Sequence, residues 1–253
     1  KMLSKIQLKS TYLTNFQRAY FSRMANVSPD AKVYDCVVIG GGSGGMGAGR
    51  KAAALGKKVA LIENKKLGGT CVNVGCVPKK VMLNLASYVE EAQLFRDYGV
   101  RGTENMSIDW KHFKQQRDGY VARLNGIYAN NLKNSGIDFF QGTASFENAN
   151  EVVTSEGAKL AAEHIVVASG SSTNVPKFPG WEHCWTSDDV FKMEELPKSV
   201  VVLGGGYIGV EMSQILCGLG VKTSLVSRGL FVGMVDSEVV CVLLENMKKL
   251  GLD

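Results

Sequence analysis

The sequence lacks long hydrophobic stretches, a high cysteine content and an extreme balance of polar and apolar residues. Its longest apolar runs are about six residues, as in SVVVLG, whereas a membrane-spanning helix needs about twenty. Hydrophobic residues make up 45% and charged residues 21% of the chain, which excludes a disordered, a collagen-like or a disulfide-dense chain. A length of 253 residues suits one large globular domain or two of ordinary size.

Acidic residues are absent before Asp30. This N-terminal stretch is rich in Ser, Thr, Lys and Arg, and its apolar residues recur at helix-like spacings, which is typical of a mitochondrial transit peptide. Arg18-Ala19-Tyr20 also resembles a matrix-protease cleavage site. We therefore predict that residues 1–30 are a transit peptide for the mitochondrial matrix, with a cytosolic form starting at Met24. A disordered terminus is the alternative interpretation.

The net charge of +5 belongs to this N-terminal stretch. Five of the 29 basic residues precede Asp30, which leaves 24 to balance the 24 acidic residues. Because these charges cancel, we expect no nucleic-acid-binding surface on the globular part of the chain.

The segment from Tyr34 to Glu63 has the pattern of a β-α-β unit. An apolar, β-branched run at 34–40 predicts a strand that stops at glycines, and Ala- and Gly-rich spacing predicts a helix over 43–56. A second apolar run at 58–63 predicts the next strand. Later in the chain we predict helices over 77–95 and 108–134, and strands over 139–146, 151–154, 164–168 and 199–204.

The glycine pattern of this unit returns once. Two G-x-G-x-x-G motifs lie 164 positions apart, namely Gly40, Gly42 and Gly45, and Gly204, Gly206 and Gly209. The helix-ending Gly56 recurs as Gly220 at the same offset. In such motifs the first glycine permits a tight turn, the second a close approach of pyrophosphate, and the third close packing of helix on strand. Two matched copies predict two dinucleotide-binding units, and glycine turns that bind no nucleotide are the alternative.

The two units differ at the residue expected to choose the ligand. Glu63 ends the second strand of the first unit, where a carboxylate binds ribose hydroxyls and repels a 2′-phosphate. This residue suits the ADP half of FAD, or NAD. The second unit has uncharged Ser227 there, followed by Arg228, which favours the 2′-phosphate of NADPH. A solvated surface charge is the alternative for Arg228.

Two cysteines follow the first unit in the segment GGTCVNVGC. Pro78 is placed to start a helix after Cys71 and Cys76, and a helix N-terminus with nearby lysines favours the thiolate form. A C-x4-C pair can close a small disulfide ring. A zinc site would need four ligands, and no second Cys or His pair is suitably spaced. We therefore predict electron flow from NADPH to a flavin, then to this dithiol and to a disulfide substrate.

The segment GGTCVNVGCVPKK resembles the signature of the pyridine nucleotide-disulfide oxidoreductases that carry a dithiol. From about Tyr34 to Ser227 the chain is similar to the glutathione reductases of that family. The likeness also rests on GGGSGG at 40–45, RDGYVARLNGIY at 117–128 and GGGYIGVEM at 204–212. It implies FAD and NADPH as cofactors, glutathione disulfide as the substrate and a homodimeric assembly.

The resemblance also implies roles for individual residues. Cys71 would form the mixed disulfide with glutathione, and Cys76 would be the flavin-proximal thiol. Lys79 and Glu211 would form an ion pair near the flavin. The implied substrate contacts are Ser43, Arg50 and Tyr128. The implied cofactor-binding residues are Gly40, Gly42, Ser43, Gly45, Glu63, Thr70, Lys80, Ala168, Ser169, Gly170, Gly204, Gly206, Tyr207, Gly209 and Arg228.

Two features depart from the family pattern. The family has a second arginine a few residues after the first for the 2′-phosphate, and the stretch after Arg228 has none up to Met234. We therefore expect weaker discrimination between NADPH and NADH. The sequence ends at Asp253, inside the predicted NADPH domain, so the resemblance covers about half a subunit. The family's general-acid histidine has no counterpart in it.

The predicted architecture is an α/β fold with two Rossmann-like βαβ domains. Residues 31–170 form the FAD-binding domain with the redox dithiol, and residues 171–253 form an incomplete NADPH-binding domain. The predicted function is NADPH-linked reduction of glutathione disulfide, without metal. The alternatives are reduction of thioredoxin or another disulfide, a flavin NADH oxidase or peroxidase, and a truncated chain without catalytic activity.

Overall fold

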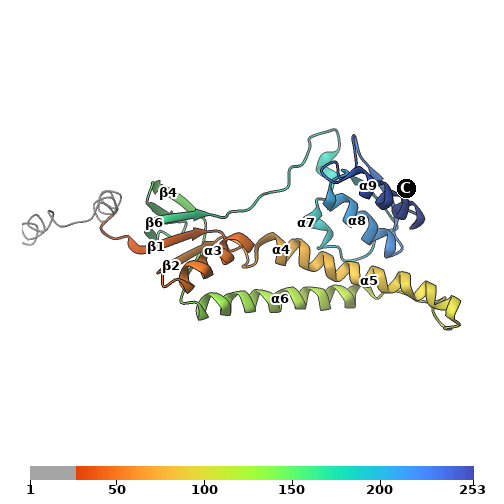
Figure 1. The fold of residues 1–253 in the computed structure, drawn as a ribbon, viewed down its shortest axis with the longest axis horizontal. Helices are drawn as coiled ribbons and strands as arrows, with labels where there is room; N and C mark the ends of the chain where they lie inside the picture. The colour runs from red at the N-terminus through yellow and green to blue at the C-terminus, as the bar shows by residue number, and fades with distance from the viewer. Residues whose placement is uncertain (1–26) are drawn as a thin grey trace, which may run out of the picture. The chain divides into compact units, whose positions relative to one another are not determined.

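The computed structural model describes residues 27–253, whose helices and strands are shown in Figure 1. This part of the chain divides into two compact units. Unit 1 comprises the described residues up to Cys71 together with Leu124–Ser171, and unit 2 comprises Val72–Arg123 together with Ser172–Asp253. The segment Val72–Arg123, which the sequence assigned to the FAD-binding domain, thus groups with the later residues. The ligand assigned to each domain stays a prediction.

The predicted transit peptide lies mostly outside the described residues, but its last residues belong to the fold of unit 1. The backbone N–H of Ser28 donates a hydrogen bond to Glu151 Oε2 at 2.9 Å. The ammonium of Lys159 donates to Asp30 Oδ1 at 3.1 Å. These two bonds fasten residues 28–30 to the strands that carry Glu151 and Lys159.

Unit 1 is built on a six-stranded sheet with the order β3-β2-β1-β6-β5-β4. Its strands are β1 (Lys32–Ile39), β2 (Val59–Glu63), β3 (Asp138–Gln141), β4 (Ala144–Asn148), β5 (Glu151–Thr154) and β6 (Lys159–Val167). The first three and β6 run parallel, whereas β4 and β5 pair antiparallel. Every residue of β2 is buried, as expected for a strand covered on both faces.

The prediction of one strand over 139–146 is wrong, because Gly142 divides it. Gly142 has φ +140°, which a side chain would not tolerate, and β3 and β4 on either side of it lie at opposite ends of the strand order. Gln141 and Ala144 are only three residues apart, so their Cα atoms are at most about 11 Å apart. A flat sheet of six strands would separate its edges by about 24 Å. The sheet must therefore curl.

The helix α3 (Ser43–Ala54) follows β1, as predicted. Alternating residues of the central strands point to opposite faces of the sheet. Val38, Val59 and Leu61 share one buried cluster with residues of α3 and of the end of α6, and Val37, Ala60 and Ile62 share another with β5 and β6. The sheet of unit 1 is thus covered on both faces, consistent with an α/β fold.

Unit 2 contains the second β-α-β segment. It consists of β7 (Ser199–Leu203), α8 (Tyr207–Gly218) and β8 (Lys222–Val226), followed by α9 (Ser237–Lys249). The two strands pair in parallel. We would expect both faces of so small a sheet to be open, but Leu225 is buried against Met247 of α9 and Leu252. Val201 on the other face is 60% exposed.

The remainder of unit 2 is helical. It includes α5 (Cys76–Leu94) and the first half of α6 (Trp110–Asn134), both near their predicted bounds, and the short α7 (Ser187–Val190). Two short 3₁₀ helices, η2 (Phe95–Tyr98) and η3 (Trp181–His183), complete the elements of this unit, and α4 (Gly69–Val74) spans the division between the units. Met82, Ala86 and Trp110 share one core cluster with Ile215 and Leu216, which explains why residues 72–123 group with α8.

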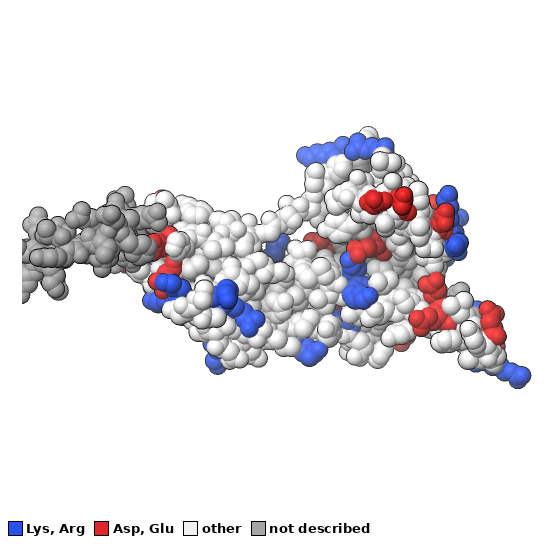
Figure 2. Space-filling view, viewed as in Figure 1, with Lys and Arg blue, Asp and Glu red and all other residues white. Residues whose placement is uncertain are grey.

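No helix within residues 27–253 is both long enough and apolar enough to cross a membrane. Figure 2 shows acidic and basic side chains in small separate groups on one face of the described chain. This distribution agrees with the near balance of charge outside the N-terminal stretch.

Candidate dinucleotide and dithiol sites

The first glycine-rich loop connects β1 to α3. Gly40 has φ +108°, and a Cβ added there would lie 2.2 Å from the carbonyl oxygen of Ala168. A Cβ on Gly45 would lie 1.8 Å from the carbonyl oxygen of Gly40. Both positions therefore require glycine, as the motif predicts. The N-cap residue Gly42 supplies no side-chain hydrogen bond, so the N–H groups of the first turn of α3 are available to an anion.

Glu63 holds the backbone of this loop. One carboxylate oxygen accepts a hydrogen bond from Gly41 N at 2.6 Å, and the other accepts from Lys65 N at 2.7 Å. The side chain is buried, and each oxygen has a further lone pair. Glu63 can thus shape the loop as well as accept a hydrogen bond from a ribose hydroxyl. The loop and the open helix N-terminus fit the pyrophosphate and ribose of a dinucleotide.

The segment after β2 folds back onto the first loop. Gly68 N donates to Gly41 O at 2.8 Å, and a Cβ added at Gly69 would lie 2.8 Å from Gly42 Cα. This contact was not anticipated from the sequence, although the adjacent glycines were visible in it. It places the start of α4, with exposed Thr70, beside the first glycine-rich loop.

The segment after β6 also reaches this loop. Ala168 N donates to Ile39 O at 2.8 Å, and Gly170 has φ +71°. Ala168, Ser169 and Gly170 were predicted to bind the flavin cofactor, and the structure brings the first of them against Gly40. Ser169 and Gly170 are exposed.

The second glycine-rich loop repeats the geometry of the first. Gly204 has φ +127°, and a Cβ on Gly209 would lie 2.2 Å from Gly204 O. Gly206 is the N-cap of α8 and, like Gly42, supplies no side-chain cap bond within the described chain. The residues expected to distinguish the ligand also follow β8. Ser227 Oγ accepts a hydrogen bond from Gly229 N at 3.3 Å, and Arg228 and Tyr207 are exposed.

The predicted substrate residues line one hollow of unit 1. Ser43 and Arg50 of α3 and Tyr128 of α6 border a hollow of about 360 Å³. Met46 and Asn131 line it as well, and sequence reasoning missed them. Asn131 lies three residues after Tyr128 on one face of α6, so helical periodicity could have found it. The arginine can pair with a carboxylate, and the tyrosine offers a ring and a hydroxyl.

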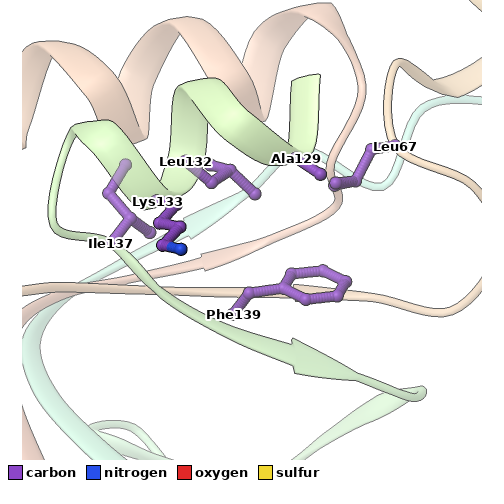
Figure 3. Close-up of a pocket in the computed structure, with 6 residues that line it drawn as sticks. All are labelled: Leu67, Ala129, Leu132, Lys133, Ile137 and Phe139. Carbon is purple, nitrogen blue, oxygen red and sulfur yellow. The ribbon is translucent and has the colours of Figure 1, made fainter. Parts of the chain in front are cut away.

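A second hollow of unit 1, of about 200 Å³, lies between the end of α6 and β3. Figure 3 shows that Leu132, Ile137 and Phe139 line it. Lys133 is the charged residue in its lining, and the other lining residues, Leu67 and Ala129, are apolar. Its chemistry therefore offers little to a polar substrate, in contrast to the hollow that contains Arg50.

The two predicted redox cysteines lie on successive helices. Cys71 is half-buried in α4, and Cys76 is exposed at the first residue of α5. The structure records both side chains as thiols. Gly75 is the N-cap of α5 and supplies no side-chain cap bond, so the N-terminus of α5 can stabilise a thiolate. Among residues 27–253, no group of three or more His, Cys, Asp or Glu side chains could hold a metal ion.

Lys79 of α5 and Glu211 of α8 form an ion pair, as the resemblance implied. Both helices belong to unit 2, and both side chains keep partial contact with solvent, at 20% and 41% exposure. Ala86 and Gly218 lie one heptad further along the same two helices, and a Cβ on Gly218 would lie 3.1 Å from Ala86 Cβ. Small residues at this contact allow the helices to approach closely. Lys80, predicted to contact the cofactor, is exposed.

Comparisons with known proteins agree with this arrangement. A family model described as pyridine nucleotide-disulphide oxidoreductase matches residues 34–253. A glutathione reductase of Debaryomyces hansenii is 46% identical over 223 residues, covering 78% of this chain and 46% of the relative. That of Yarrowia lipolytica is 44% identical over 208 residues, covering 78% and 44%, respectively. That of Schizosaccharomyces pombe is 38% identical over 235 residues, covering 90% and 51%. The chain thus spans about half the length of these curated relatives.

Proposed function

Because the chain belongs to the pyridine nucleotide-disulphide oxidoreductase family, we propose that it is part of an enzyme that reduces glutathione disulfide with NADPH. FAD is the proposed flavin, bound through its ADP half by the first glycine-rich loop. NADPH is the proposed coenzyme of the second loop. Cys71 and Cys76 are the proposed redox pair, and the mitochondrial matrix is the proposed location.

The observation that carries the substrate assignment is the hollow lined by Ser43, Arg50 and Tyr128. These residues come from two helices that are far apart in the sequence, yet they border one cavity. Glutathione disulfide carries several carboxylates and amides, which a guanidinium, a phenol and a hydroxyl can bind. The similarity to three glutathione reductases supports the same assignment.

The proposed chemistry uses the dithiol as an electron carrier. In the oxidised pair, a bond joins the sulfurs of Cys71 and Cys76. FAD held by the first glycine-rich loop would supply two electrons from NADPH, and with two protons these would convert the disulfide to two thiols. The Cys71 thiolate then attacks one sulfur of glutathione disulfide, and one glutathione leaves as the mixed disulfide forms. Attack by Cys76 on Cys71 releases the second glutathione and restores the internal disulfide.

A substitution of Arg50 tests the substrate. Arg50→Met should raise the KM for glutathione disulfide about 10-fold or more and change kcat less, because it removes binding of the ground state. Lys51→Met is the matched control, since Lys51 is an exposed cation on the next position of α3 and does not line the hollow. An unchanged KM in Arg50→Met would reject glutathione disulfide as the substrate.

A pair of serine substitutions tests the dithiol. Cys71→Ser and Cys76→Ser should each abolish disulfide turnover in the flavin-loaded enzyme. After reduction by NADPH, Cys71→Ser should show long-wavelength charge-transfer absorbance from the remaining Cys76 thiolate, and Cys76→Ser should not. The reverse pattern would exchange the two roles.

A further inference from the structure

Val232 has an unusual backbone conformation. Among residues 27–253 it is the one residue other than glycine with a positive φ, at 45°. A β-branched side chain is strongly disfavoured there. Such strain persists where surrounding contacts hold it, and it is concentrated at functional sites. Val232 lies in the segment Ser227–Val235 after β8, which we call the second return loop.

The second return loop is tied to the second glycine-rich loop by one backbone hydrogen bond. Val232 N donates to Gly205 O at 2.7 Å. The first unit has the same bond 164 positions earlier, where Gly68 N donates to Gly41 O at 2.8 Å. Gly68 has φ +94°. Both copies therefore place a left-handed residue at this position, and only the second copy uses a residue that is strained by it.

Side-chain packing offsets the strain. Phe231 and Val232 both pack against the cluster of Val210, Leu225, Met247 and Leu252. Phe231 and Val232 lie in a turn, and with Val232 at φ 45° both side chains face the same core. A Cβ added at Gly205 would lie 2.6 Å from Ser227 Oγ and 3.0 Å from Phe231 Cδ1. The return loop thus lies directly on the glycine-rich loop.

We propose that Val232 is a positioning residue for coenzyme selection. By donating to Gly205 O, it fixes the second return loop so that Arg228 meets a phosphate on the 2′ position of the adenosine ribose. Ser227 follows β8 directly and Val232 is held by Gly205, so the intervening Arg228 lies on a segment fixed at both ends. The inference rests on the proposed use of NADPH by this unit.

Two substitutions at one position test the inference in the full chain. Val232→Gly keeps the N–H and accepts a positive φ without strain. Val232→Pro removes the N–H and cannot adopt a positive φ. Calorimetric titration with 2′-phospho-ADP-ribose and with ADP-ribose measures the contribution of the 2′-phosphate. We expect Val232→Pro to lower the preference for the phosphorylated ligand about 10-fold or more, and Val232→Gly to keep it within about two-fold of the parent chain.

Each result bears on the proposal. Equal loss of preference in both variants would show that the valine side chain, not the backbone bond, matters, and would overturn it. Retention in both would overturn it as well. Loss of ADP-ribose binding in Val232→Pro would show a general collapse of the site and contradict a role in selection. Arg228→Ala tests the premise separately from the inference. If this variant kept the preference for the phosphorylated ligand, the proposed contact of Arg228 with the 2′-phosphate would be rejected.

Discussion

The two glycine-rich loops have nearly the same backbone but different side chains at the end of their second strands. In the first unit, Gly40 N donates to Ile62 O at 2.8 Å, and in the second unit, Gly204 N donates to Val226 O at 2.8 Å. Glu63 then binds two backbone N–H groups of the first unit, whereas Ser227 Oγ binds one of the second. The two loops thus share their backbone, and on our proposal the residues that follow the second strand select the ligand.

We expect the largest effect from substitutions that add a methyl group at the third glycine of each G-x-G-x-x-G motif. Gly45→Ala and Gly209→Ala place a Cβ 1.8 Å and 2.2 Å from a backbone carbonyl oxygen. Each should cost about 3 kcal/mol or more of unfolding free energy and abolish nucleotide binding at its own loop. Chemical denaturation and ligand titration measure the two effects.

Gly47 provides the control for this pair. It also lies in α3, but a Cβ there meets no atom within 4 Å. Gly47→Ala should therefore be neutral or raise the stability of the chain by up to about 1 kcal/mol. If Gly47→Ala lost as much unfolding free energy as Gly45→Ala, then any methyl group in this part of α3 would destabilise the chain. The contact with Gly40 would not be the cause.

The next largest expected effect concerns the preference for NADPH over NADH, which we attribute to Ser227 and Arg228 at the position that Glu63 occupies in the first unit. Arg228→Ala should reduce the preference for NADPH over NADH by about 10- to 100-fold, because a charge-assisted contact contributes roughly 1.5–3 kcal/mol. Steady-state kinetics with both coenzymes, in the enzyme that contains this chain, measures the ratio. Lys222→Ala removes a cation at the opposite end of β8 and should leave the ratio unchanged.

The end of the helix in each β-α-β segment is expected to give a smaller difference in stability. Gly218 ends α8 where Ala54 ends α3, and a Cβ on Gly218 would lie 3.1 Å from Ala86 Cβ of α5. Gly218→Ala should be better tolerated in an Ala86→Gly background than in the parent chain. The coupling free energy should be about 1 kcal/mol in a double-mutant cycle of unfolding. Additive effects would show that the contact does not limit the approach of the helices.

The two units also differ in their buried acidic residues, from which we expect the smallest effect, on the pH dependence of stability. The two buried carboxylates among the described residues, Glu63 and Glu151, both lie in unit 1. The hydrogen bond from Ser28 N, helped by Asn148 and Lys159, lowers the pKa of Glu151 below its ordinary value of 4.5. The charged form is therefore stabilised by folding, and this stability is present above pH 4.5 and lost as the pH falls below it.

Glu151→Gln should consequently flatten the acid dependence of unfolding below pH 4.5 while lowering stability near neutral pH. Denaturation midpoints between pH 3 and 7 measure this change. Glu147→Gln, an exposed neighbour on β4, is the control and should leave the slope nearly unchanged. A slope equally steep in both variants would assign the acid sensitivity to other groups.

The sequence predicted the parts of the fold that carry strong local signals. The strands of both β-α-β segments are short apolar runs, and Gly56 and Gly220 end the helices with φ +78° and +86°. α4 was missed because it has six residues and includes Gly, Thr and Asn, which are weak helix formers. β6 begins five residues before its predicted start, because Leu160 and Ala161 are buried by pairing with distant β1 rather than by a local pattern.

Some parts of the candidate sites could be predicted from local sequence motifs, and others depend on packing between distant segments. The glycine motifs identified the two loops directly, and the Lys79–Glu211 ion pair followed from the resemblance. The redox role of the cysteine pair stays a prediction. The shared hollow of Arg50 and Tyr128 depends on the packing of α6 against α3, which no local pattern specifies. The strain at Val232 has no compositional signal, but the 164-residue repeat that aligns it with Gly68 could have revealed the position.

The parallel pairing of β1 with β6 has a consequence for how unit 1 forms during synthesis. Val37 pairs with Ile165. During synthesis β1 therefore leaves the ribosome more than a hundred residues before β6, the strand that pairs with one of its edges. Until then, one edge of β1 has no partner from the sheet, and an apolar strand edge is a template for misassembly. Contacts so distant in sequence also make folding slow. Unit 1 should therefore be most prone to misassembly before Val167 has been added.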